Sequence, residues 1–199
     1  MTKARTARRG GRACRTLCTV VTVATLIAGA GEARATVATY RSTRDLAGGA
    51  TAIFRGLVLE RAAHWQGDLI VTDVLVAVDE CWAGECQAPT AVVREIGGEV
   101  DGIGMLSPEP TPLPIGEEVV VFGRQNGPVL VAVGGAQGVF RVEASGDRAR
   151  RDLASVEELP AAVELELTVS ALRREVVRAW TRTVVRDPRA VIADRTLPR

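Results

Sequence analysis

The clearest pattern in the chain is the alternation of apolar and polar positions between Leu69 and Val78. A period of two places successive side chains on opposite faces of a β-strand. The side that is richer in β-branched residues consists of Ile70, Thr72, Val74, Val76 and Val78. The segment is therefore predicted to be an antiparallel strand with one face in the core.

Five further segments show the short apolar runs that are typical of strands. They are Ala52–Glu60, Thr90–Ile96, Glu117–Phe122, Val129–Val133 and Gly138–Val142. Gly56 stands in the middle of the first segment, where a missing side chain marks a bulge or a bend. Six strands with no helix between most of them favour a mainly β fold, either a small antiparallel β-barrel or a sandwich.

The connections between these strands are predicted to be loops. Arg61–Gly67 contains His64 and Trp65 and ends at a Gly-Asp turn signal. The connection from Glu99 to Pro114 is longer, and its prolines lack the backbone N–H that a strand ladder needs. We interpret this Pro-rich arm as a candidate partner contact, with a plain surface connection as the alternative. Its central prolines are Pro108, Pro110 and Pro112.

A helical pattern follows the strands toward the C-terminus. Thr168 is placed to cap this helix, and apolar residues recur every four positions along one stripe. The stripe consists of Leu172, Val176, Trp180 and Val184. An amphipathic helix is predicted over about 168–185, packed on the barrel or closing one of its mouths. A short helical turn is also predicted over Thr43–Ala47, capped by Ser42 or Thr43.

Composition divides the chain into three parts. We expect a leader over 1–35, a β-barrel domain over 36–144, and a C-terminal part over 145–199. Within the last part, Gly146–Asp152 is predicted to be a charged linker that precedes the helix, and the end of the chain is predicted to be a disordered tail.

The first 35 residues have the composition of a secretory signal peptide. Basic residues precede the acid-free run Leu17–Ala30, and small residues surround Ala35. We expect cleavage near Ala35 and export to the periplasm or the extracellular space. The apolar run is shorter than the roughly 20 residues that span a bilayer, so no membrane span is expected. General secretion is favoured over the twin-arginine route because two glycines follow the arginine pair at 8 and 9. A lipid anchor at Cys18 is a minor alternative.

Removal of this leader changes the charge of the chain. The full sequence carries 25 basic and 24 acidic side chains, whereas residues 36–199 carry 18 and 23, a net charge of −5. Residues 36–144 hold seven arginines against fourteen acids. An acidic body without a basic stripe argues against nucleic acid binding.

Cys81 and Cys86 are the two cysteines of the predicted mature chain, and Trp82 lies between them. Two thiols at this spacing in an oxidising compartment are expected to form a disulfide around a tight loop. The ring is expected to fix the shape of the loop and the register of the flanking strands. Trp82 is predicted to cap the barrel rim, with a partner contact as the alternative.

The other chemical groups do not favour catalysis or metal binding. A structural zinc site needs about four ligands, and the mature chain offers Cys81, Cys86 and His64. The cysteine spacing is not Cys-x-x-Cys, and a single histidine without a nucleophile motif does not favour a catalytic triad. Glu117 and Glu118 are expected to point to opposite faces of a strand. We therefore expect no enzyme, no metal and no cofactor.

Several of these segments together resemble a known group of secreted domains. The segments are Ala52–Gly56, Ile70–Val78 with Glu80–Gly84 behind it, Ile115–Phe122, and Gly134–Gly135 with Phe140–Val142. Over about residues 40–142 the chain is similar to the OB-fold-like barrel of tissue inhibitors of metalloproteinases and netrin-type modules, as are many exported bacterial proteins. Those inhibitors begin with a cysteine that chelates the target's zinc and carry several disulfides, whereas this chain is predicted to begin at Thr36. The resemblance thus implies a fold and does not extend to the inhibitory mechanism.

Three functional hypotheses follow. The first is an exported, non-enzymatic binding or inhibitor-like module that holds an extracellular or periplasmic protein or a glycan. The second is a structural component of the cell envelope without a discrete ligand. The third is an enzyme of unrecognised type, which would depend on His64 or on a pair of carboxylates.

Overall fold

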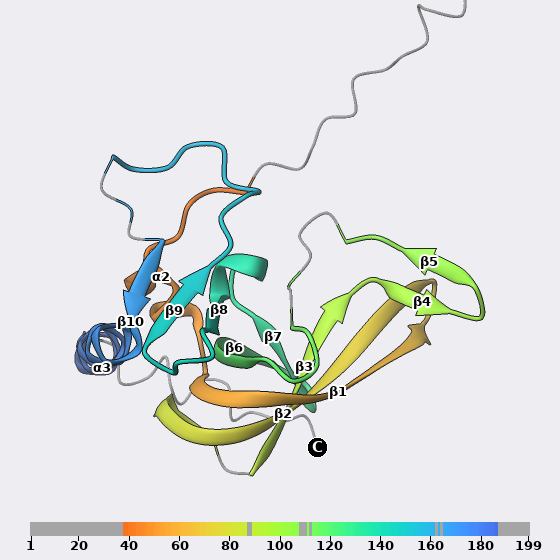
Figure 1. The fold of residues 1–199 in the computed structure, drawn as a ribbon, viewed down its shortest axis with the longest axis horizontal. Coiled ribbons are helices and arrows are strands. Elements are labelled where there is room, and N and C mark those ends of the chain that lie inside the picture. Colours follow the sequence, from red (N-terminus) through yellow and green to blue (C-terminus); the bar gives the residue numbers. More distant parts are fainter. Residues whose placement is uncertain are drawn as a thin grey trace, which may run out of the picture. The chain divides into compact units, whose positions relative to one another are not determined.

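The computed structural model describes residues 38–86, 89–107, 111, 113–161, 163 and 165–186, with side chains as far as residue 182. Within these residues, ten strands form a sheet of eight and a sheet of two (Figure 1). The strands are β1 (Ala52–Gln66), β2 (Leu69–Gly84), β3 (Thr90–Ile96), β4 (Gly98–Val100), β5 (Ile103–Met105), β6 (Glu118–Asn126), β7 (Val129–Ala132), β8 (Val139–Val142), β9 (Arg148–Arg151) and β10 (Glu166–Thr168). The helices are α2 (Thr43–Gly49), the 3-10 helix η1 (Gly135–Gly138) and α3 (Val169–Arg186). The predicted mainly β class with a C-terminal helix is confirmed.

Five of the strands close into a barrel. β1 pairs with β2 along one edge and with β6 along the other, and β3 and β7 complete the ring between them. Every pair in this ring is antiparallel except β3–β7, which is parallel and rests on the single residue pair Val93 and Leu130. The sheet then continues outward from β6 through β8 and β9 to β10. The arrangement is a closed barrel, one of the two arrangements, barrel or sandwich, that the strand pattern predicted.

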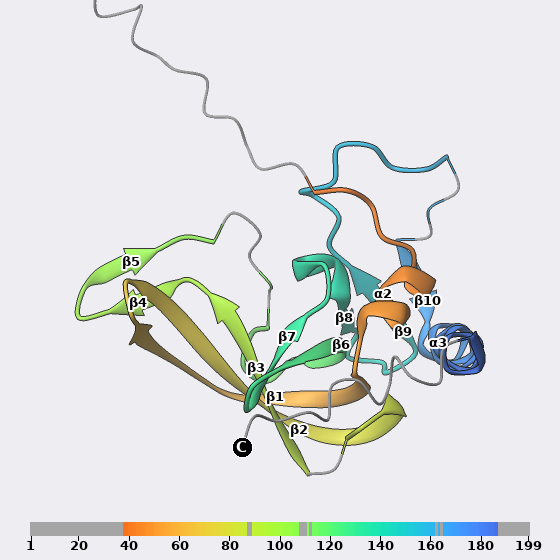
Figure 2. The same cartoon turned by 180° about the vertical axis from the view of Figure 1, so that it is seen from behind.

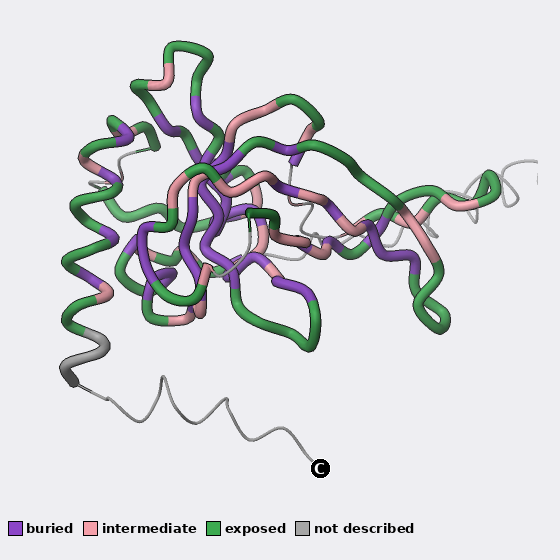
Figure 3. The backbone as a smooth tube through the Cα atoms, turned by 90° about the horizontal axis from the view of Figure 1, so that it is seen from below, coloured by how far each residue is buried: buried purple, intermediate pink, exposed green. Residues whose placement is uncertain are grey.

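The hydrophobic core has two main layers. One cluster fills the barrel and includes Phe54, Val74 and Val93, all fully buried. A second cluster lies between the outer face of the barrel and the helices, where Ile53 packs in the same cluster as Leu172 of α3. Neighbouring residues of β1 thus supply both layers, because strand side chains alternate between faces. Figure 3 shows buried and exposed positions alternating along α3, as expected for a helix with one face on a core.

Strand β1 is longer than its sequence predicted. Residues 61–66, which we expected to form a loop, continue β1 and pair with residues 69–74 of β2. The register of this hairpin shifts between Arg55 and Gly56, at the predicted bend. The loop prediction was wrong because this end of the hairpin is exposed on much of its surface, so its side chains lack the apolar alternation of a buried strand.

Two other segments predicted to lack regular structure contain strands. Within the long connection from Glu99 to Pro114, β4 and β5 form a small hairpin around Asp101-Gly102, whose φ angles of 53° and 77° are those of a tight turn. Within the predicted charged linker, Arg148–Arg151 forms β9 and pairs with β8. The sequence did not predict these strands because they are short. Three or four residues are too few to show an alternation of apolar and polar positions.

The C-terminal helix begins and packs as predicted. The Oγ1 atom of Thr168 accepts a hydrogen bond from the N–H of Ala171 at 3.2 Å, which caps the helix. Leu172 and Val176 are fully buried, and Trp180 packs against the same cluster. The Val184 side chain, the predicted leader and cleavage site, and the predicted tail lie outside the described residues, as do Pro108, Pro110 and Pro112.

The segment before α2 is held against the barrel by buried polar side chains. Gln137 accepts a hydrogen bond from the N–H of Arg41 and donates one to the carbonyl of Thr39. Arg151, which is 4% exposed, donates to the carbonyl of Arg41 and the hydroxyl of Tyr40. Ser42 then caps α2 in a reciprocal capping box with Asp45. The start of the barrel domain is thereby fixed by side chains from η1 and β9, which are distant in the sequence.

Candidate functional site

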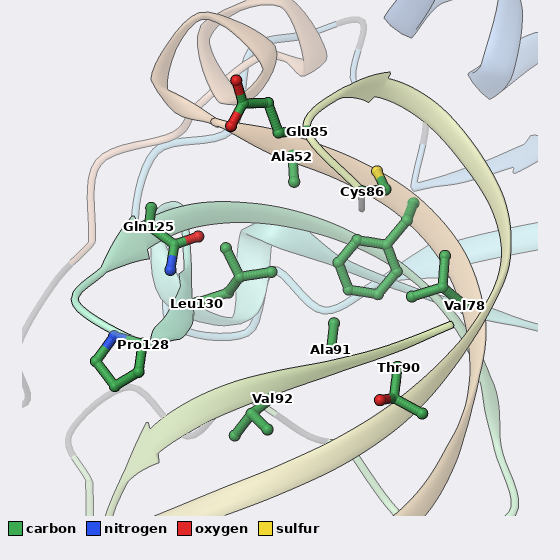
Figure 4. Close-up of a pocket in the computed structure, with 11 residues that line it drawn as sticks. Ala52, Val78, Glu85, Cys86, Thr90, Ala91, Val92, Gln125, Pro128 and Leu130 are labelled. Carbon is green, nitrogen blue, oxygen red and sulfur yellow. The ribbon is translucent and has the colours of Figure 1, made fainter. Parts of the chain in front are cut away.

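One end of the barrel carries a hollow of about 350 Å³, which we call the mouth (Figure 4). It lies where β3 and β7 begin, just before the one residue pair that joins them. Because only one residue pair connects β3 and β7, these two strands diverge here and leave the barrel open on this side. The lining residues are Ala52, Phe54, Val78, Glu85, Cys86, Thr90, Ala91, Val92, Gln125, Pro128 and Leu130.

The mouth combines an apolar floor with a few polar groups at its rim. Phe54 and Leu130 are buried, whereas Glu85, Thr90 and Gln125 are exposed. The Gln125 amide already donates to the carbonyl of Gly127, which holds the β6–β7 turn. The mouth offers an apolar contact with polar surroundings and does not bring together an acid and a base for catalysis.

A disulfide borders the mouth. Cys81 and Cys86 are bonded, with their Cα atoms 5.8 Å apart, as their spacing predicted. The bonded segment, which we call the clasp (Cys81–Cys86), is less of a loop than expected, because β2 continues as far as Gly84. Gly84 has φ of 79°, and a Cβ there would lie 2.0 Å from the carbonyl oxygen of Thr51. The clasp therefore turns sharply at a position that only glycine fits.

Removing the disulfide should cost little stability. In the chain-entropy model, a six-residue ring contributes about 2 kcal/mol, so the Cys81→Ser/Cys86→Ser variant should remain folded and lose about that amount. Urea unfolding of the wild-type and variant chains measures the difference. Complete unfolding of the variant in buffer would show that the clasp holds the barrel together.

Trp82 lies inside the fold rather than at its surface. Its side chain is 7% exposed and belongs to the cluster beneath α3. Its Nε1 atom donates to Glu80 at 3.3 Å, and Glu80 forms an ion pair with Arg173 of α3 at 2.9 Å. The indole thus packs in the cluster beneath α3. The roles predicted for Trp82, a cap on the barrel rim or a partner contact, stay predictions.

The opposite end of the barrel domain exposes a group of large apolar side chains. We call it the tip surface, and it consists of Trp65, Leu69, Ile96, Ile103 and Leu106. Leu106 is 96% exposed, and the other four are between 43% and 57% exposed. They come from the ends of β1, β2 and β3 and from the β4–β5 hairpin, which packs along β1 and β2. Figure 2 shows this hairpin on the opposite side of the barrel from α3, as Figure 1 does from the other direction.

The side chains of the tip surface lie on two faces of the β1–β2 hairpin, because Trp65 is paired with Ile70 whereas Leu69 is paired with Gln66. Ile96 is paired with Val71, and Val71 is two residues from Leu69 on the same face of β2. Gly97, which follows Ile96, lies against the backbone of Leu106. Sequence reasoning missed this surface because its members are separated along the chain and three of them, Trp65, Ile103 and Leu106, stand in segments predicted to be loops.

A buried ion pair lies on the inner face of the barrel toward the same end. Glu95 is 7% exposed, and its Oε2 atom accepts a hydrogen bond from Arg61 Nη2 at 2.8 Å. Its Oε1 atom has no hydrogen-bond partner, and burial raises the pKa of this carboxyl to about 7, against the opposing effect of Arg61. Arg61 also donates to the carbonyl of Leu113 at 2.7 Å, so it ties the end of the Pro-rich arm to β1.

The remaining candidate groups are separated or already paired. His64 Nε2 lies 3.9 Å from Asp73, and that carboxylate is held by Arg94 at 2.6 and 2.7 Å, which lowers its pKa. Glu117 and Glu118 form ion pairs with different arginines, on β8 and β1. In the part of the chain that the structure describes, no three His, Cys, Asp or Glu side chains are grouped as a metal site would require.

Comparison with known proteins adds no assignment. No protein-family model, curated protein or solved structure matches this chain. Among the described helices, none has the length and apolar character needed to cross a membrane.

Proposed function

We propose that this protein is an exported, non-enzymatic binding module that holds an extracellular or periplasmic protein through its tip surface. The observation that carries the proposal is the group of five exposed apolar side chains on adjoining elements of a closed barrel. Several large apolar side chains exposed at one end of a fold cost solubility, and such groups mark interaction sites in folded proteins. A protein partner is favoured over a glycan, because among the described residues Trp65 is the one large aromatic side chain that is well exposed.

Export is supported by the clasp and by the composition of residues 1–35. Disulfides persist in oxidising compartments and are rare in the cytosol, and the clasp is a bonded pair of cysteines. The leader has the basic start and the apolar run of a signal peptide. If the resemblance to inhibitor domains extends to function, blocking a protease would be one form of partner binding.

The test is retention of a partner from the periplasmic and culture fractions of cells that produce the chain. The Leu69→Ser/Ile96→Ser variant removes two apolar side chains of the tip surface. The Leu159→Ser/Leu165→Ser variant removes two comparably exposed leucines from the connection between β9 and β10. We expect a protein, identified by mass spectrometry, to be retained by the wild-type chain and the second variant and lost by the first. Equal retention by both variants would remove the tip surface from the proposal, and self-assembly without a partner would favour the structural alternative.

A further inference from the structure

The charges around the tip surface narrow down the partner that it would hold. Asp68 precedes Leu69 in the β1–β2 turn, and Glu99 and Asp101 stand in the β4–β5 hairpin beside Ile103. All three carboxylates belong to exposed residues, and none of them forms an ion pair within the described part of the chain. Apolar side chains at the tip are thus flanked by three uncompensated negative charges.

The cations at this end are already engaged. Arg94 is bound by Asp73 through two hydrogen bonds, and Arg61 is bound by Glu95. Neither arginine is available to neutralise the tip carboxylates without breaking a close ion pair. The field around the tip is therefore negative, and the excess of acids in residues 36–144 adds to it.

The hairpin turn fixes the position of one of these charges. Asp101 has φ of 53° and Gly102 has φ of 77°, as required at the two central positions of a tight hairpin turn. A backbone fixed in this way holds its carboxylate near the apolar residues of β5 at little further entropic cost. The tip is a preorganised combination of apolar and acidic groups.

We infer that the tip surface recognises a partner segment in which lysine or arginine residues alternate with large apolar residues. This inference rests on the proposed function and specifies the chemistry of the partner. The apolar side chains would supply most of the affinity, and the carboxylates would supply specificity and speed of association. A second copy of this chain fits poorly, because two facing tips would bring six carboxylates together.

The experiment is a fluorescence anisotropy titration with three labelled synthetic peptides of equal length. The first peptide alternates Lys with Leu, the second replaces each Lys with Glu, and the third replaces each Leu with Ser. We expect the Lys–Leu peptide to bind at least about tenfold more tightly than either of the others, with an affinity that falls as salt screens the charges.

Two charge variants locate the effect. Asp68→Asn/Glu99→Gln/Asp101→Asn removes the three tip charges, and Asn is accepted at the positive φ of position 101. Glu157→Gln/Glu158→Gln/Glu175→Gln removes three exposed charges elsewhere on the domain. The first variant should lose about tenfold in affinity for the Lys–Leu peptide and most of the salt dependence, and the second should bind as the wild-type chain does.

The possible failures are distinguishable. Equal affinity of the Lys–Leu and Glu–Leu peptides, both weakened by Leu69→Ser/Ile96→Ser, would overturn the basic partner and leave binding at the tip in place. Equal loss of affinity in the two charge variants would also overturn it, because the attraction would then be non-local. Unchanged binding of the Lys–Leu peptide by Leu69→Ser/Ile96→Ser would count against both the inference and the proposed function.

Discussion

The Glu95→Gln variant is expected to be more stable than the wild-type chain at pH 8, by up to about 3 kcal/mol. Glu95 is buried, its Oε1 atom has no partner, and its pKa is raised from 4.5 to about 7. The wild-type chain must bury a carboxylate above that pH, whereas glutamine stays neutral and nearly isosteric. A gain on removing a charge is unusual, because most substitutions destabilise.

The sign of the pH dependence follows from the direction of the shift. A carboxyl whose pKa is higher in the folded chain binds its proton more tightly there, so its stabilising contribution is complete below about pH 4.5. That contribution is lost as the pH rises through about 7. The stability difference between Glu95→Gln and wild type should therefore grow between pH 5 and pH 8.

Urea unfolding across this pH range measures the difference. Glu60→Gln serves as the control, since Glu60 is exposed on β1 beside Arg61, the partner of Glu95. We expect the control to follow the wild-type curve. A pH-independent difference between Glu95→Gln and wild type would show that Arg61 compensates the buried carboxylate fully.

The Gly56→Ala variant should lose more than about 4 kcal/mol or fail to fold. Gly56 lies in β1 where that strand pairs with both β2 and β6. A Cβ at this position would lie 2.1 Å from the carbonyl oxygen of Ala77 and 2.9 Å from a methyl group of Val76. The backbone of β2 would have to move away, and the ring of strands would open at its most extensively paired hairpin.

Gly48→Ala is the matched control. Gly48 lies in α2, and a Cβ there would meet nothing within 4 Å. Alanine is the better helix former, so this variant should be more stable than wild type by about 0.5–1 kcal/mol. Thermal unfolding of both variants checks the pair. Comparable stability of Gly56→Ala and Gly48→Ala would contradict the closed barrel.

The sequence predicted the buried strands well and the exposed ones poorly. Thr90–Ile96 has the bounds expected of it, because a strand with one buried face keeps its alternation to both ends. The end of the β1–β2 hairpin lacks this alternation, because solvent reaches much of its surface and apolar side chains are not required there. The β4–β5 hairpin is too short for any period, although Asp-Gly is a known hairpin turn.

The sequence likewise predicted one part of the candidate site, the disulfide, and did not predict the burial of Trp82 and Glu95. Cysteine spacing was sufficient to predict the disulfide, because two thiols five positions apart have few other options in an oxidising compartment. Trp82 is buried because α3 packs over its side of β2. Sequence alone does not show which face of a strand a distant helix will cover. Glu95 lies within the predicted strand Thr90–Ile96, but a glutamate on the inward face contradicts the usual preference of this side chain for solvent.

Binding at the tip rather than at the mouth is tested most directly by hydrogen exchange of the wild-type chain with and without the retained partner. The account predicts slower exchange over residues 64–71 and 95–106 in the complex, with no change at the mouth around residues 52–54 and 128–131. Protection confined to the mouth and clasp, with an unchanged tip, would contradict it.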